Sequence, residues 1–310
     1  MNRTPDPRQA PGPRTAVTGP RPLGPAATGE DPHPGSGRHE PGPTVTYAFA
    51  LTRTPPPDDL LAGAAGHEGG GPLRVLRAGS LALVVQDVPA EAFDTAALTE
   101  RFNDSYQLER CARAHHEGVH AAAGHGAVVP LPLATLYLSD RNATDAVAAR
   151  ETAVHALLDR LDGRTEWAVK VHAAQGGSSP APEDGPVTPA ESGRAYLSRA
   201  SARRRAHQVA REDALALAHA VDLELRRHVV AATRHRPQSE QLTGRSTPQL
   251  LNAAYLVDDA QRPALARALD GLRADERFGG LEIDESGPWI PYSFARLDEA
   301  LDGVEGKVDA

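Results

Sequence analysis

The order in which short alternating segments and helical stripes follow one another constrains the fold class of this chain most. Segments with the alternating or continuous apolar residues of strands lie at 47–51, 73–77, 81–86, 127–131, 133–138, 167–171, 250–257 and 281–284. Segments with helical spacing lie at 94–123, 144–161, 190–234 and 263–274. Because strands and helices are mixed along the chain, this order predicts an α+β fold with largely antiparallel sheets.

Local signals set the ends of several of these elements. The two strand-like segments on either side of Ala78-Gly79-Ser80 are typical of a hairpin. Asp94 is placed to cap the helix that follows it, and the helical spacing there allows a break near Asn103-Asp104. The alternation returns at residues 167–171, and we expect this strand to close the first structural unit.

Proline and glycine divide the chain into parts. Residues 1–43 are dense in both and nearly lack large apolar side chains, so they bury too little surface to offset their ordering entropy and are predicted to be a disordered tail. Residues 175–189 are rich in Gly, Ser and Pro and are predicted to be a linker. The sequence thus predicts an N-terminal α+β domain at 44–174, a C-terminal helical and α+β domain at 190–300, and a short tail at 301–310.

Charge and cysteine content argue against several classes of function. The formal net charge is −8, whereas nucleic-acid binders and polybasic membrane anchors rely on Lys and Arg. We therefore expect neither a nucleic acid nor a membrane as a partner. No apolar run approaches the roughly 20 residues of a bilayer span, and the N-terminus lacks the apolar stretch of a secretory signal. With Cys111 as the single cysteine, the chain fits a reducing compartment, and we expect it to be cytoplasmic.

The stretch His116-Glu117-Gly118-Val119-His120 matches the zinc protease pattern, in which two His one helical turn apart bind the metal and the Glu is the general base. Such a site needs a third ligand. The extended form of the pattern would place a His where this chain has Gly126, and His125 is one position off. A zinc-dependent hydrolase is therefore kept as the alternative hypothesis, and a solvated helix face is the simpler interpretation.

Cys111 and His115 are also one helical turn apart, which is compatible with a thiolate–imidazole pair. The sequence offers no third residue to orient such a pair, and a buried, inert cysteine is the commoner arrangement. We predict no catalytic residue and no cofactor.

Two groups of residues are candidates for contact with a protein partner. Trp289 and Tyr292 lie in a proline-containing turn, and exposed aromatic side chains often dominate protein interfaces. Their alternative role is to anchor the C-terminal strand by packing. Arg203, Arg204 and Arg205 lie within the long helical segment and would suit an acidic partner, or simply form a solvated turn.

Several segments, in their order and spacing over about residues 45–296, resemble the gas vesicle protein F/L family. They are Tyr47-Ala48-Phe49-Ala50, residues 81–85 with Val88-Pro89, Ala112-Arg113-Ala114-His115, residues 127–131 with Ala134-Thr135-Leu136-Tyr137, residues 166–171, residues 193–197, residues 252–257 and residues 287–294.

The resemblance implies a two-domain α+β protein with ferredoxin-like, antiparallel sheets packed with helices and a long helical segment in its second part. It also implies an accessory or minor structural role in gas vesicle assembly, in contact with the hydrophobic shell protein and with other gas vesicle accessory proteins. An acidic partner that covers an apolar surface would prevent aggregation of the shell protein before it assembles. We therefore expect a gas vesicle-associated protein that is not an enzyme.

The chain departs from the family pattern at two positions. Pro132 stands where family members often carry Arg, so no charge role is expected at that strand. Ile290 stands where a second proline is common, which is interpreted as a local packing change.

Overall fold

The computed structural model describes residues 42–174, 193–238 and 247–296. These ranges belong to one compact unit. Three predicted parts of the chain lie outside the described residues. They are the linker at 175–189, the tail at 301–310, and the tail at 1–43 except for residues 42 and 43.

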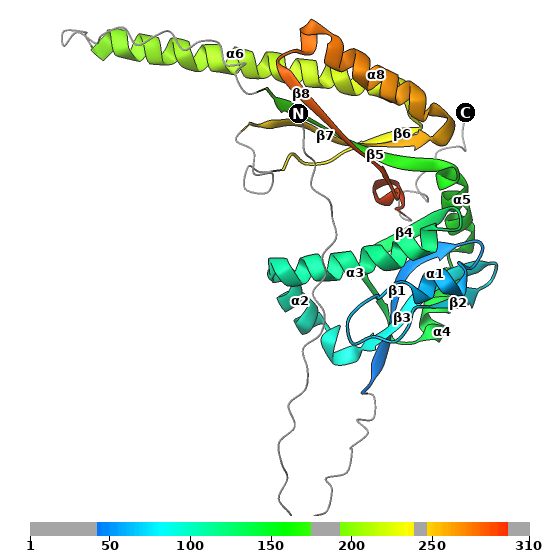
Figure 1. The fold of residues 1–310 in the computed structure, drawn as a ribbon. Helices are drawn as coiled ribbons and strands as arrows, with labels where there is room; N and C mark the ends of the chain where they lie inside the picture. The colour runs from blue at the N-terminus through cyan, green and yellow to red at the C-terminus, as the bar shows by residue number, and fades with distance from the viewer. Residues whose placement is uncertain (1–41, 175–192, 239–246, 297–310) are drawn as a thin grey trace, which may run out of the picture. The chain divides into compact units, whose positions relative to one another are not determined.

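The first sheet has four antiparallel strands in the order β2-β3-β1-β4 (Figure 1). The strands are β1 (Thr44–Thr52), β2 (Arg74–Ala78), β3 (Leu81–Pro89) and β4 (Val128–Tyr137). The predicted hairpin joins β2 to β3, and Gly79 supplies the positive φ of 63° that its turn requires. In β1, the register shifts between Ala48 and Ala50, so that Phe49 and Ala50 both reach the same hydrophobic cluster.

Helices cover both faces of the first sheet (Figure 1). The helices are α1 (Asp58–Ala62), α2 (Thr95–Asn103), α3 (Ser105–Ala123), α4 (Asp140–Ala148) and α5 (Glu151–Leu161). On the α3 face, Tyr47 and Phe49 pack with Val119 in a cluster that also includes residues of α1. On the other face, Leu83 packs with Leu157 and other residues of α4 and α5.

The predicted break in the helix at 94–123 is confirmed. Asp94 caps α2 by accepting a hydrogen bond from the N–H of Ala97 at 2.8 Å, and Asp104 caps α3 by accepting one from the N–H of Gln107 at 2.8 Å. The second cap satisfies a free N–H group at the start of α3, which allows the chain to change direction there.

The second sheet also has four antiparallel strands, in the order β6-β7-β5-β8. The strands are β5 (Arg164–Ala173), β6 (Ala231–Arg234), β7 (Gln249–Asp258) and β8 (Leu281–Trp289). The strand at 167–171 therefore exists, but it does not close the first unit. Because both of its edges find partners in β7 and β8, β5 is a central strand of the second sheet. The architecture is α+β, as predicted.

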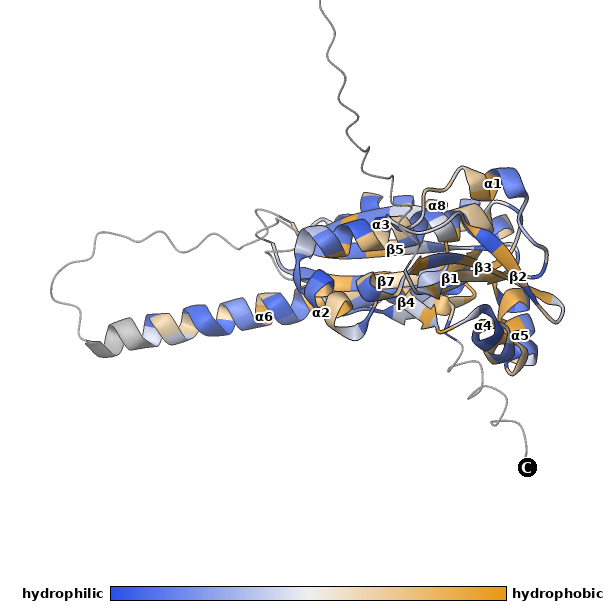
Figure 2. Ribbon diagram, turned by 90° about the horizontal axis from the view of Figure 1, so that it is seen from below, coloured by the Kyte–Doolittle hydropathy of each residue, from blue (hydrophilic) through white to orange (hydrophobic). Residues whose placement is uncertain are grey.

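Two helices, α6 (Gly193–Leu225) and α8 (Arg262–Ala274), cover one face of the second sheet (Figure 1). Their apolar side chains pack on Val169 and Tyr255 in a second core. Only the C-terminal part of α6 joins this core, through residues such as Val221 and Leu225. The rest of α6 extends beyond the sheet and is mainly hydrophilic, as Figure 2 shows.

The structure corrects two helix predictions and adds one helix. The helix expected at 144–161 is two helices, because α4 ends at Ala148 and α5 begins at Glu151. The helix expected at 190–234 ends at Leu225 and is followed by β6, whose pairing with β7 overrides the helical propensity of its residues. Helix α1 was not predicted. Short 3₁₀ helices lie at Ala90–Ala92, Arg226–His228, Asp259–Gln261, Glu276–Phe278 and Tyr292–Phe294.

Candidate partner-binding surface

The segment at residues 287–294 leaves the second sheet at the end of β8 and is fixed to β5 by a buried carboxylate. Glu166 accepts a hydrogen bond from the backbone N–H of Ser293 at 2.8 Å and another from its hydroxyl at 2.7 Å. Glu166 is 8% exposed, so these bonds satisfy a charge that has little access to water. Nε2 of His235 lies 3.2 Å from the same hydroxyl.

Apolar contacts fix the segment at both sheets. Phe294 is buried in the hydrophobic cluster that includes residues of α4 and α5, and Leu256 of β7 belongs to the same cluster. Ile290, one of the departures from the family pattern, packs against the cluster under α3. At Gly287, φ is 150°, and a Cβ there would lie 3.0 Å from the Trp167 ring, so glycine permits this close approach. The segment is therefore held at several points.

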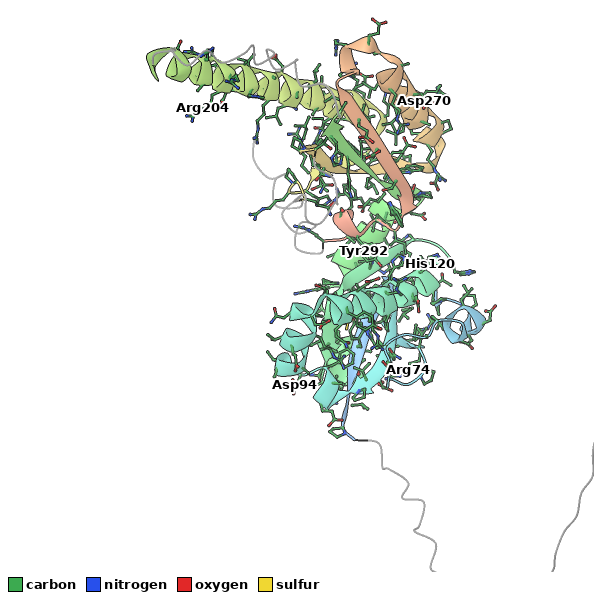
Figure 3. All side chains as sticks on the ribbon, turned by 60° about the vertical axis from the view of Figure 1, so that its left-hand side comes forward. Arg74, Asp94, His120, Arg204, Asp270 and Tyr292 are labelled. Carbon is green, nitrogen blue, oxygen red and sulfur yellow. The ribbon has the colours of Figure 1, made fainter. Side chains whose placement is uncertain are left out.

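Trp289 and Tyr292 remain half-exposed on this fixed segment. Trp289 is 48% exposed, and its indole N–H donates to the hydroxyl of Ser286 at 3.3 Å. Tyr292 is 37% exposed, and its hydroxyl forms a hydrogen bond with Nδ1 of His116 on α3 at 3.1 Å. Partial burial of the ring raises the pKa of the Tyr292 hydroxyl, so it is protonated at neutral pH. In Figure 3, Tyr292 lies beside the part of α3 that carries His120.

The side-chain arrangement gives no support to the zinc hydrolase hypothesis. The rings of His116 and His120 are 6.2 Å apart between centroids, and Tyr292 already binds one nitrogen of His116. Within the described ranges, no group of three or more His, Cys, Asp or Glu side chains is placed to hold a metal ion. Gly118 is explained by packing, because a Cβ at this position would lie 2.4 Å from the Phe49 ring.

The pair Cys111 and His115 is buried, and the two nitrogens of His115 have partners. Nε2 lies 3.0 Å from the carbonyl oxygen of Leu131, which can only accept, so Nε2 carries the proton. Nδ1 then accepts from the Tyr47 hydroxyl at 2.9 Å. Burial lowers the pKa of His115 to about 4. With both nitrogens engaged, His115 is a structural histidine that has no free lone pair for a thiol.

The predicted arginines lie elsewhere. Arg203, Arg204 and Arg205 are exposed on the part of α6 that extends beyond the second sheet. Figure 3 shows Arg204 far from Tyr292, so the structure does not bring the two predicted groups together. The sequence interpretation missed Glu166 and Ser293 as residues that fix the turn. One sequence signal could have pointed to Glu166. It is a carboxylate at the start of a predicted strand whose later residues alternate between polar and apolar.

Residues 45–296 match the model of a family described as gas vesicle synthesis protein GvpL/GvpF. The chain belongs to the GvpL/GvpF family. It is also 39% identical over 256 residues to gas vesicle protein L of a Streptomyces species, an alignment that covers 82% of this chain and 94% of that protein.

Solved structures of the GvpL/GvpF family share the fold. The crystal structure of GvpF from Anabaena sp. superposes with a TM-score of 0.57 at 15% identity, covering 82% of this chain and 96% of that one. GvpF from Microcystis aeruginosa superposes with a TM-score of 0.52 at 15% identity, covering 81% and 99% of the two chains. At this identity, the likeness establishes the fold. Among the described helices of this family member, none is both long enough and apolar enough to cross a bilayer.

Proposed function

We propose that this chain is an accessory protein of gas vesicle assembly that binds the major shell protein and prevents its aggregation during nucleation. Family membership, together with the 39% identity to gas vesicle protein L of a Streptomyces species, supports the assembly role. Association with gas vesicles and with other accessory proteins is part of the same proposal.

A physical argument supports the need for such a protein. A wall that encloses gas must present an apolar face to it, so its subunit exposes a large apolar surface until it is assembled. Large exposed apolar patches drive aggregation. A folded, acidic protein that covers such a surface would keep the subunit in solution, and this chain has a formal net charge of −8.

The surface around Trp289 and Tyr292 is the proposed contact for the shell protein. The observation that carries this assignment is that two half-exposed aromatic side chains lie on a segment fixed by Glu166. Aromatic side chains bury much apolar area on binding, and a segment that is already ordered loses little entropy when a partner binds. Arg203, Arg204 and Arg205 are a second proposed contact, for an acidic segment of a partner.

Co-expression with the major shell protein tests this function. The expected result is a soluble complex that co-purifies, with binding about tenfold or more weaker in the Trp289→Ala variant, as for a central interface aromatic. Leu138→Ala is the matched control, because Leu138 is an 82% exposed apolar residue that follows β4 of the first sheet.

Two results would contradict the proposal. If the unchanged protein formed no complex and the shell protein stayed insoluble, the binding function would be wrong. If Trp289→Ala and Leu138→Ala weakened the complex equally, the binding function would stand, but the surface would be assigned to the wrong residues.

A further inference from the structure

The part of α6 that extends beyond the second sheet has an unpartnered surface. α6 is 33 residues long, but its buried side chains begin at Ala218, and the side chains of residues 201–213 are all exposed. Figure 1 shows this part of the helix reaching past the strands of the sheet. A helix that buries no face relies on its intrinsic propensity alone, which is marginal in water.

An apolar line runs along this helix on the side away from the sheet. Ala202, Val209, Ala216 and Leu223 follow one another at intervals of seven residues, which is the spacing of one of the two core positions in a coiled-coil heptad. Leu223 is two residues before the buried Leu225, so it lies about 200° around the helix from it, on the opposite side. Val209 is 55% exposed and Leu223 is 52% exposed. The seam therefore faces solvent.

Opposite charges lie along one flank of the seam. Arg205 follows Ala202 by three residues, and Glu212 follows Val209 by three residues, so both lie on the same flank. Arg205 has no hydrogen bond or ion pair with any residue in the described ranges, and Glu212 accepts a bond from Gln208 of its own helix at 2.8 Å. A second α6 in parallel orientation would place the charged flanks of the two copies on opposite sides of the interface, so that Arg205 and Glu212 of different copies could not meet. An antiparallel α6 would place each Arg205 beside a Glu212.

We propose that two copies of this chain associate through antiparallel α6 helices, with Val209 at the twofold axis. In this arrangement, Ala202 of each copy faces Ala216 of the other, and the small side chains allow the helices to approach closely. Arg205 of each copy pairs with Glu212 of the other, so that the twofold symmetry forms the ion pair twice. Only Arg205 belongs to this interface, because Arg203 and Arg204 are turned away from the seam by about 100° per residue.

This pairing does not depend on binding of the shell protein. Where both occur, the dimer carries two Trp289 and Tyr292 surfaces, and the second contact with a repetitive shell becomes intramolecular. Dimerisation would then raise the effective affinity for the shell without any additional contact between the Trp289 and Tyr292 surface and the shell protein.

Charge reversal tests the pairing in the full chain by analytical ultracentrifugation. The unchanged protein is expected to be a dimer, and Arg205→Glu or Glu212→Arg is expected to weaken the association about tenfold, because each places like charges together twice. The double variant Arg205→Glu/Glu212→Arg is expected to regain the original affinity. Arg211→Glu is the matched control, since Arg211 is exposed and lies about 200° around the helix from Val209, so the same charge change should leave the dimer unchanged.

Cysteine cross-linking gives an independent readout of the same geometry. Cys111 is buried, so it should react slowly. Val209→Cys should form a disulfide between two chains under mild oxidation, because residue 209 faces itself across the twofold axis. Gln208→Cys, one residue away on the flank, should cross-link far more slowly.

The proposal would be overturned by any of four results. These are a monomeric unchanged protein, single charge reversals that leave the dimer as stable as before, a double variant that does not regain affinity, and equal cross-linking at positions 208 and 209.

Discussion

The carboxylate of Glu166 on β5 accepts two hydrogen bonds from Ser293, one from the backbone N–H and one from the hydroxyl. These two residues are far apart in the sequence, and their contact fixes the segment that carries Trp289 and Tyr292. This buried carboxylate is therefore one of the contacts that set the position of the proposed partner-binding surface.

Removing this carboxylate should weaken the fold. Glu166→Ala leaves the partly buried N–H and hydroxyl of Ser293 without this acceptor, and we expect the free energy of unfolding to fall by about 2 kcal/mol. Ser293→Ala keeps the backbone bond to Glu166 and loses only the contacts of the hydroxyl with Glu166 and His235, so its loss should be about 1 kcal/mol. Urea titrations of the three proteins measure both values. Glu117→Ala, an exposed change on α3, is the control. A Glu166→Ala protein as stable as the unchanged protein would show that the carboxylate does not hold the turn.

Gly118 provides a second test, in which helix propensity and packing predict opposite results. Alanine at this position should favour α3 by about 1 kcal/mol, but its Cβ would lie 2.4 Å from the Phe49 ring. Because overpacking of a core costs about 1–3 kcal/mol, we expect Gly118→Ala to lower the thermal unfolding midpoint.

The control for this prediction is Gly271 in α8. A Cβ there meets nothing within 4 Å, so Gly271→Ala should raise stability by up to about 1 kcal/mol. A rise in the unfolding midpoint for both variants would refute the close packing of α3 on β1.

Two buried histidines predict how stability changes with pH. Burial, with a smaller effect of nearby positive charge, lowers the pKa of both His67 and His115 from 6.5 to about 4. As pH falls from about 6.5 to about 4, the unfolded chain takes up protons that the folded chain does not bind, so stability falls through this window and is fully present above it. The loss should amount to about 3 kcal/mol or less for each histidine.

Denaturant midpoints measured between pH 7 and pH 4 test this dependence. The His67 side chain has a buried, unpartnered Nε2, so His67→Leu should reduce the slope without breaking a side-chain hydrogen bond. His125→Gln, a change at an exposed histidine, is the control variant. An unchanged slope in His67→Leu would mean that His67 is protonated equally in the folded and unfolded chains.

The sequence predicted elements whose boundaries are set by local chemistry. The break between α2 and α3 was predicted because the side chain of Asp104 itself provides the cap. The break between α4 and α5 was missed, because Ala149 and Arg150 carry neither a glycine nor a proline to signal it. β6 was also missed, since Ala231–Arg234 is only 4 residues long and forms a strand through its pairing with β7.

In the candidate surface too, the sequence revealed local features but not contacts between distant residues. Trp289 and Tyr292 could be selected from the sequence because aromatic residues beside prolines are conspicuous there. The contacts of Glu166 with Ser293 and of His116 with Tyr292 could not, because each joins residues separated by more than a hundred positions. Only the folded chain brings such residues together.

Because β5 is a central strand of the second sheet, it is unpaired during part of the synthesis of the chain. β5 leaves the ribosome before either of its neighbours, β7 and β8, has been translated. One edge therefore stays without its partner until β7 has been added at residue 258, and the other until β8 has been added at residue 289. During that interval, the nascent chain exposes an unpaired strand, which is a site for misassociation with other chains, so rapid translation or a chaperone should increase the yield of folded protein.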